Sequence, residues 1–188
     1  MPGAGVGSLR RTAVLFEGGS DRLAFEALAR RSDVVLDGLD LVELKGITNL
    51  RTRLTALCGT GARALGLFDA AEGRYVTGVL RDLGMLQGDD LGAAGFFGCD
   101  RDLEEEVIRA AGSDLVLETL SSRGELARFR MFQRQPAQRI RSIEDQLHRF
   151  AGTAAGRKTR FAADVIEVVP LDRMPVPLTR LLDAARNG

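Results

Sequence analysis

The sequence predicts an α/β protein built on a parallel sheet, and three observations support this fold class. The chain has 188 residues, 45% of them hydrophobic and 28% charged, which is enough for one sizeable buried core. Short aliphatic runs alternate with segments whose apolar residues recur at helical spacing, and glycine turns separate the two. This alternation is typical of a parallel sheet that helices cover on both faces.

Four short apolar runs are the expected strands. They are residues 12–17, 41–44, 64–68 and 95–99. An amphipathic helical pattern follows each of them, and we expect Ser20 to cap the first of these helices. The sequence therefore predicts about four parallel strands, each leading into a helix.

The strand pattern fades after residue 113, and helical patterns take its place. They lie at residues 115–120, 125–132, 143–150 and 178–185, while residues 161–169 suit either a strand or a buried helix. We expect a flexible tail over residues 1–11 and an α/β core over 12–112. Residues 113–188 are then a mainly helical extension that completes the same domain.

Charge is segregated along the chain although the formal net charge is zero. Residues 69–118 carry twelve acidic and four basic side chains, whereas residues 123–160 carry ten basic and three acidic ones. An acidic block repels itself unless cations bind to it, and a basic block suits phosphates. The pattern predicts a metal site together with a polyanionic ligand.

Several classes of protein are excluded. No apolar run is long enough to span a bilayer. Cys58 and Cys99, 41 residues apart without a secretory prefix, indicate reduced thiols and a cytoplasmic location. There is no Gly-Lys-Ser/Thr phosphate loop, so any ATP-driven step requires a separate ATPase partner.

Acidic residues follow three of the four expected strands. They are Glu17 and Asp21, then Asp69 and Glu72, and then Asp100, Asp102, Glu104, Glu105 and Glu106. Ligands of parallel α/β sheets bind at the carboxyl ends of the strands, and Mg²⁺ or Mn²⁺ prefers oxygen ligands. We therefore expect side-chain oxygens of Glu17, Asp69 and Glu104 to converge on one or two such cations. Zinc is disfavoured, because His148 is the single histidine.

The same residues resemble a known family. Residues 16–21, Phe-Glu-Gly-Gly-Ser-Asp, look like the first TOPRIM motif, and residues 67–73, Leu-Phe-Asp-Ala-Ala-Glu-Gly, look like the second. Residues 102–106 and 156–158 are similar to the later Leu-Glu and lysine motifs of OLD-family nucleases. The resemblance covers about residues 12–168. It implies a Rossmann-like TOPRIM fold and Mg²⁺- or Mn²⁺-dependent hydrolysis of nucleic-acid phosphodiester bonds, with DNA favoured over RNA.

The resemblance also implies roles for individual residues. Glu17 and Asp21 would help to hold one metal ion and Asp69 another, with Glu104 adding a ligand. Glu17 would thereby be catalytic, as would Lys158, which would stabilise charge on the phosphate.

The second motif departs from the family pattern at one position. Ala71 stands where a TOPRIM motif usually has a second acid. Either Glu72 reaches the site from the first helical turn, or the second metal ion is bound weakly. The sequence leaves one-metal and two-metal chemistry open.

A basic stretch late in the chain is the candidate contact with nucleic acid. Arg134, Arg139 and Arg141 alternate there with glutamines, and Arg157 precedes the motif lysine. Arginine and glutamine suit phosphate and base-edge contacts. A solvated helix face, or a patch that neutralises the acidic half of the fold, remains an alternative for these residues.

Purely structural roles remain open for other residues, and other functions remain open for the chain. Taken singly, Glu72, Asp100, Asp102, Glu105 and Glu106 are expected to be solvated acids of a first helical turn, and His148 a structural or surface residue. For the whole chain, the alternative to a nuclease is a catalytically weak TOPRIM module that binds nucleic acid or docks on an ATPase. A primase or an RNA-maturation nuclease sharing the domain is a third possibility.

Overall fold

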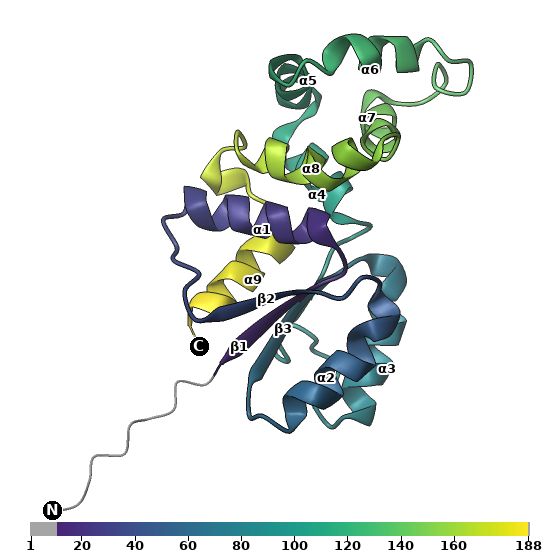
Figure 1. The fold of residues 1–188 in the computed structure, drawn as a ribbon. Helices are drawn as coiled ribbons and strands as arrows, with labels where there is room; N and C mark the ends of the chain where they lie inside the picture. Colours follow the sequence, from purple (N-terminus) through teal and green to yellow (C-terminus); the bar gives the residue numbers. More distant parts are fainter. Residues whose placement is uncertain (1–10, 188) are drawn as a thin grey trace, which may run out of the picture.

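Four parallel strands form the centre of the protein in the computed structural model, which describes residues 11–187 (Figure 1). They are β1 (Thr12–Phe16), β2 (Leu39–Glu43), β3 (Arg63–Phe68) and β4 (Phe96–Gly98). Their order in the sheet is β2-β1-β3-β4, and each neighbouring pair is parallel. The predicted α/β class is confirmed; the predicted tail lies almost wholly outside the described residues.

Helices surround this sheet and make up the rest of the described chain. The nine α-helices between residues 11 and 187 are α1 (Gly19–Arg31), α2 (Leu50–Cys58), α3 (Gly73–Asp82), α4 (Leu103–Ala111), α5 (Ser113–Ser122), α6 (Leu126–Gln133), α7 (Ile143–Ala151), α8 (Ala155–Ile166) and α9 (Val176–Arg186). Three short 3₁₀ turns are η1 (Ile47–Asn49), η2 (Ala70–Glu72) and η3 (Leu171–Arg173). The chain after residue 113 is helical, as its pattern predicted.

Two apolar cores lie on the two faces of the sheet. One face is covered by α2 and α3, which bury Leu54, Val76 and Leu80 against it. The other is covered by α1 and α9, with α8 packed on α1 (Figure 1). Helices α5, α6 and α7 gather at the end of the molecule away from the sheet. The late helix α9 contacts β3 and β4, so the C-terminal part of the chain completes the cover of the sheet.

Local sequence explains the elements that lead to the site. All five residues of β1 are buried, as expected for a strand with neighbours on both sides and helices on both faces. The ambiguous segment after residue 160 forms the end of α8, because Phe161, Val165 and Ile166 are buried at helical spacing. The expectation for Ser20 was wrong: α1 already begins at Gly19, and Gly18 is its N-cap.

The apolar character of the helices and the state of the two cysteines were both expected from composition. Within residues 11–187, no helix is both long and apolar enough to cross a membrane. Cys58 is exposed and Cys99 is buried, and both are free thiols.

Helix α7 offers a test of local capping. The Ser142 hydroxyl oxygen accepts a hydrogen bond from the backbone N–H of Asp145 at 3.1 Å. Replacing Ser142 with alanine leaves that N–H without its partner, so we expect a loss of about 1 kcal/mol in the free energy of unfolding. Urea denaturation measures this loss. The matched substitution Ser121→Ala, at an exposed position inside α5, should change the stability by less than about 0.5 kcal/mol; equal effects would contradict the assigned cap.

Candidate functional site

Acidic side chains meet at the carboxyl edge of the sheet because of the strand pairing. Glu17 directly follows β1, and Asp69 directly follows β3, its parallel neighbour. The loops beyond the strands are tied to one another as well: the Ala70 N–H donates to the Arg101 carbonyl at 2.9 Å, which joins the turn after β3 to the one after β4. Acids far apart in the sequence thus lie along one edge.

Two helix N-termini bring further acids to the same edge. The Asp21 carboxylate, in the first turn of α1, accepts the Gly18 N–H at 3.2 Å. Glu104, in the first turn of α4, accepts a hydrogen bond from the Ser20 hydroxyl at 3.3 Å. This contact spans 84 residues of sequence and places the start of α4 beside the start of α1. Ser20 therefore links two of the predicted site helices, a role that sequence reasoning missed.

The clustered acids perturb one another strongly. Burial, and then the negative charge of Glu104, raises the pKa of Asp21 to about 7, against the opposing effect of the Gly18 hydrogen bond. Burial, followed by the charges of Asp21 and Asp102, raises the pKa of Asp69 to about 7 as well. Two carboxyls whose charged forms are this disfavoured mark a functional site more often than a structural one.

An acidic neighbour and a lysine act in opposite directions on the pKa of Glu17. Burial and then the charge of Glu72 raise its pKa, whereas Lys158 on α8 lowers it. Lys158 also lowers the pKa of Asp21. The predicted lysine thus acts on the cluster from a helix that is packed on α1 and comes more than 130 residues later in the chain. All five predicted acids and Lys158 therefore lie within electrostatic range of the cluster, although the Lys158 side chain forms no ion pair with a described residue.

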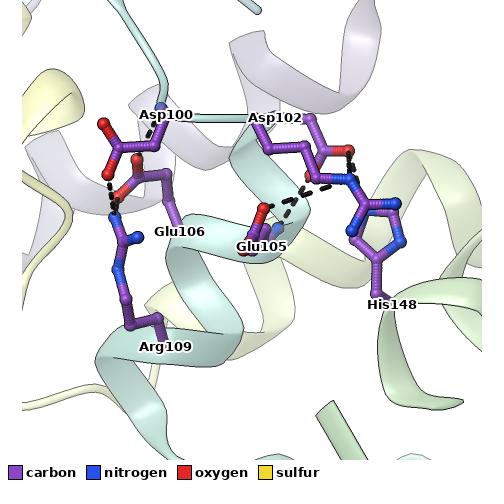
Figure 2. Close-up of polar contacts among 7 residues, drawn as sticks. Asp100, Asp102, Glu105, Glu106, Arg109 and His148 are labelled. Carbon is purple, nitrogen blue, oxygen red and sulfur yellow. Dashed lines mark hydrogen bonds and ion pairs between the residues drawn. The ribbon is translucent and has the colours of Figure 1, made fainter. Parts of the chain in front are cut away.

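His148 joins the helical part of the chain to this edge. Its Nε2 lies 2.7 Å from Oδ2 of Asp102, while the other oxygen of Asp102 caps α4 by accepting the Glu105 N–H at 2.8 Å (Figure 2). Asp102 in turn raises the pKa of Asp69. Asp102 was predicted to be a solvated acid and is instead a partly buried cap that pairs with a histidine 46 residues away. Neither spacing nor composition signals such a contact.

Glu106 corrects a second expectation. It is 5% exposed, and one carboxylate oxygen accepts the Asp100 N–H at 3.0 Å while the other lies 2.6 Å from Arg109 (Figure 2). It is therefore a buried, fully paired acid that holds the turn between β4 and α4, not a solvated one. The sequence could not distinguish it from Glu105, because both follow the same first-turn pattern.

The acids at this edge suit a divalent cation. Their carboxylate oxygens are the ligands that Mg²⁺ and Mn²⁺ prefer, and the raised pKa values of Asp21 and Asp69 reflect burial first and then neighbouring negative charge, which a cation would offset. The chemistry fits. Between residues 11 and 187, however, no three acidic, histidine or cysteine side chains stand close enough to form a ready-made metal site. Glu17, Asp69 and Glu104 thus lie along the same edge, but the expected convergence of their side-chain oxygens on a cation is not present among the described residues.

The predicted basic residues fall into two places. Arg134, Arg139 and Arg141 are exposed in the connection between α6 and α7, at the end of the molecule away from the sheet (Figure 1). Arg157 is different: its side chain is 10% exposed, pairs with Glu125 and lies over the Phe150 ring, 3.7 Å from its centroid. This leaves little of the Arg157 guanidinium free for a phosphate.

Solved structures share this fold. The chain is similar to the C-terminal region of the OLD protein of Xanthomonas campestris pv. campestris, with a TM-score of 0.69, 23% identity and coverage of 95% of this chain and 96% of that one. For the corresponding region of the Burkholderia pseudomallei OLD protein, the TM-score is 0.66, the identity 20% and the coverage 96% and 98%. No protein-family profile and no curated protein sequence matches the chain. The chain thus has the fold of the C-terminal region of OLD proteins over nearly its whole length, as the resemblance in its motifs predicted.

Proposed function

We propose that this protein is a Mg²⁺- or Mn²⁺-dependent nuclease that hydrolyses phosphodiester bonds, with DNA as the favoured substrate. One observation carries the proposal: carboxylates that follow β1 and β3 and begin α1 and α4 gather at one edge of the sheet, within electrostatic range of Lys158. Uncompensated acids are costly to gather, and a cation offsets that cost. The resemblance of the motifs to OLD-family nucleases and the shared fold support the same assignment.

Each residue of the edge has a proposed task. Glu17 and Asp21 hold one cation, and Asp69 and Glu104 supply ligands for it or for a second. When bound, a divalent cation lowers the pKa of a coordinated water and neutralises charge on the phosphate. Glu17 and Glu104 have flexible side chains, so rotation about their side-chain bonds can bring their oxygens together around a cation.

Lys158 stabilises the phosphate that is cleaved. The hydrolysis adds water across a P–O bond: the water oxygen bonds to phosphorus, the bond to the leaving oxygen breaks, and that oxygen acquires a proton. Negative charge grows on the phosphate oxygens during this step, and a nearby ammonium group stabilises it. Lys158 is exposed and acts electrostatically on Glu17 and Asp21, so it can face a phosphate bound at the same edge.

Nucleic acid also fits the basic surface remote from this edge. Arg134, Arg139 and Arg141 are exposed together, and Arg139 and Arg141 use their Nε atoms for backbone carbonyls at 3.0 and 3.1 Å. Those bonds orient the guanidinium groups while leaving their remaining N–H donors available for phosphates. The resemblance to OLD-family nucleases adds a separate ATPase partner to the proposal, which would supply any ATP-driven step.

A catalytically weak module is the second candidate, and two observations favour it. Ala71 is exposed and carries no carboxylate where the resembling motif has one. The described acids also do not converge as a three-ligand group. In this case the chain binds nucleic acid, or docks on the ATPase partner, without cutting.

Nicking of supercoiled DNA decides between these functions. The nuclease is expected to convert supercoiled plasmid to open-circular and linear forms with Mg²⁺ or Mn²⁺ and not with EDTA. Single-stranded RNA assayed in parallel tests for an RNA nuclease. Binding of DNA without cleavage under any divalent cation would overturn the nuclease and support the weak module.

A further inference from the structure

A cavity with basic and apolar walls opens between α5, α6 and α8. Its volume is about 540 Å³, within the range of cavities that hold small organic ligands. Its charged lining consists of Arg123, Arg128, Arg157 and Arg160 with Glu125 and Asp164. Four guanidinium groups against two carboxylates leave an excess of two positive charges. Leu120 and Phe161, both buried, supply an apolar part of the wall.

The arginines of this cavity differ in how many of their N–H donors are already used. Arg157 is held by Glu125 and Phe150, and Arg123 lies 2.8 Å from Asp164. Arg128 pairs with Glu125 at 2.9 Å through Nη1 alone and Arg160 lies 4.0 Å from Asp164, while their side chains are 67% and 66% exposed. These two exposed guanidinium groups therefore keep further N–H donors for an incoming anion.

The cavity and the acidic edge flank the same turn of α8. Arg157 lines the cavity, while Lys158, the next residue, acts on Glu17 and Asp21. Consecutive residues of an α-helix point about 100° apart, so α8 presents these two side chains to neighbouring faces.

We propose that this cavity binds an unpaired nucleotide of the substrate strand, on the same strand as the phosphate at the acidic edge. Its phosphate contacts Arg128 and Arg160, and its base lies against Leu120 and Phe161. A base within a duplex is paired and stacked and cannot enter such a cavity, so the cavity selects single-stranded or frayed substrate. This inference rests on the proposed nuclease function, since the strand it holds is the one to be cut.

Binding without cleavage tests the cavity. The full chain in EDTA is titrated against a short fluorescein-labelled single-stranded oligonucleotide and against a blunt duplex of the same length, by fluorescence anisotropy. The double substitution Arg128→Gln and Arg160→Gln is expected to weaken single-strand binding roughly tenfold and to reduce its salt slope by about 0.7–1.4, the loss of one or two phosphate contacts. Duplex binding should weaken much less.

A matched control removes the same charge elsewhere. Arg53 on α2 and Arg173 in η3 are exposed and outside the cavity, so Arg53→Gln with Arg173→Gln reports the effect of net charge alone. Three results would each overturn the cavity assignment. The first is equal weakening of single-strand binding by both double variants, and the second is equal loss of single-strand and duplex binding in the cavity variant. The third is displacement of the labelled oligonucleotide by a polyglutamate peptide as effectively as by unlabelled oligonucleotide.

Failure of this inference and failure of the proposed function give different results. If the nuclease proposal fails, plasmid nicking is absent in the unmodified chain while the cavity variants still change single-strand binding. If only the cavity inference fails, nicking persists in the unmodified chain and the two double variants bind the oligonucleotide equally well.

Discussion

Replacing Glu17 with glutamine is expected to lower the rate of Mg²⁺-dependent plasmid nicking by at least about 100-fold. The substitution keeps the size of the side chain but removes the charge that follows β1, the central strand next to β3. The raised pKa of Glu17 shows that burial and the charge of Glu72 act on this carboxylate, so it is placed where a cation would be drawn. Initial nicking rates at saturating Mg²⁺ measure the loss.

The neighbouring strand offers the control. Glu43 ends β2, is exposed and pairs with Arg22 at 3.5 Å, outside the acidic cluster. Glu43→Gln makes the same chemical change at the same edge of the sheet, and nicking should stay within about twofold of the parent because a surface ion pair contributes little. If Glu17→Gln and Glu43→Gln cut equally well, the assignment of Glu17 to the metal site is wrong.

Replacing Asp21 with asparagine is expected to raise the stability of the metal-free protein at pH 8. The pKa of Asp21 is raised from 3.8 to about 7, so the folded protein holds a proton that the unfolded chain releases between these values. Stability therefore falls as the pH rises from about 4 through about 7, and the loss is complete above the folded pKa. Asparagine cannot ionise and avoids this loss. Solvent screening reduces the free energy that corresponds to the full pKa shift. We therefore expect Asp21→Asn to raise the free energy of unfolding by about 2 kcal/mol at pH 8 and to change it little near pH 4.

Urea denaturation in EDTA at the two pH values measures this difference. The exposed loop residue Asp37 supplies the control, and Asp37→Asn should leave the pH dependence of the parent intact. Mg²⁺ or Mn²⁺ should raise the melting temperature of the parent more at pH 8 than at pH 6, because ligands must lose their protons to bind a cation. Asp21→Asn should reduce that rise. A variant that is destabilised at pH 8, or that keeps the full effect of the cation, would contradict the placement of Asp21.

Stability and activity are thus expected to move in opposite directions at this edge. Burial first, and then repulsion between the carboxylates, raises the pKa of both Asp21 and Asp69. This arrangement is costly for the fold without a cation, which is the pattern expected if the edge is a functional site.

The sequence predicted the elements well where local pattern decides structure. β1 and β3 are within one residue of the predicted runs, because a buried parallel strand is a short, continuous apolar segment. β2 starts two residues earlier than predicted, at Leu39, because its edge position allows the exposed Asp40 within the strand. Ser20 was misassigned, because a hydroxyl near a helix start can serve as a cap or as a donor to another element.

By itself, the sequence determined that acids follow the strands of a parallel sheet, and parallel strands bring their carboxyl ends to one edge whatever their order. Only the tertiary structure decided the strand order β2-β1-β3-β4, the approach of α8 that brings Lys158 within electrostatic range of Glu17, and the pairing of His148 with Asp102. It also decided which acids are buried: Glu106 is buried, whereas Glu105, the preceding residue of the same helical turn, is only partly buried. The physical reason is that local periodicity specifies which face of an element is apolar, whereas contacts between distant elements depend on how all those faces pack together.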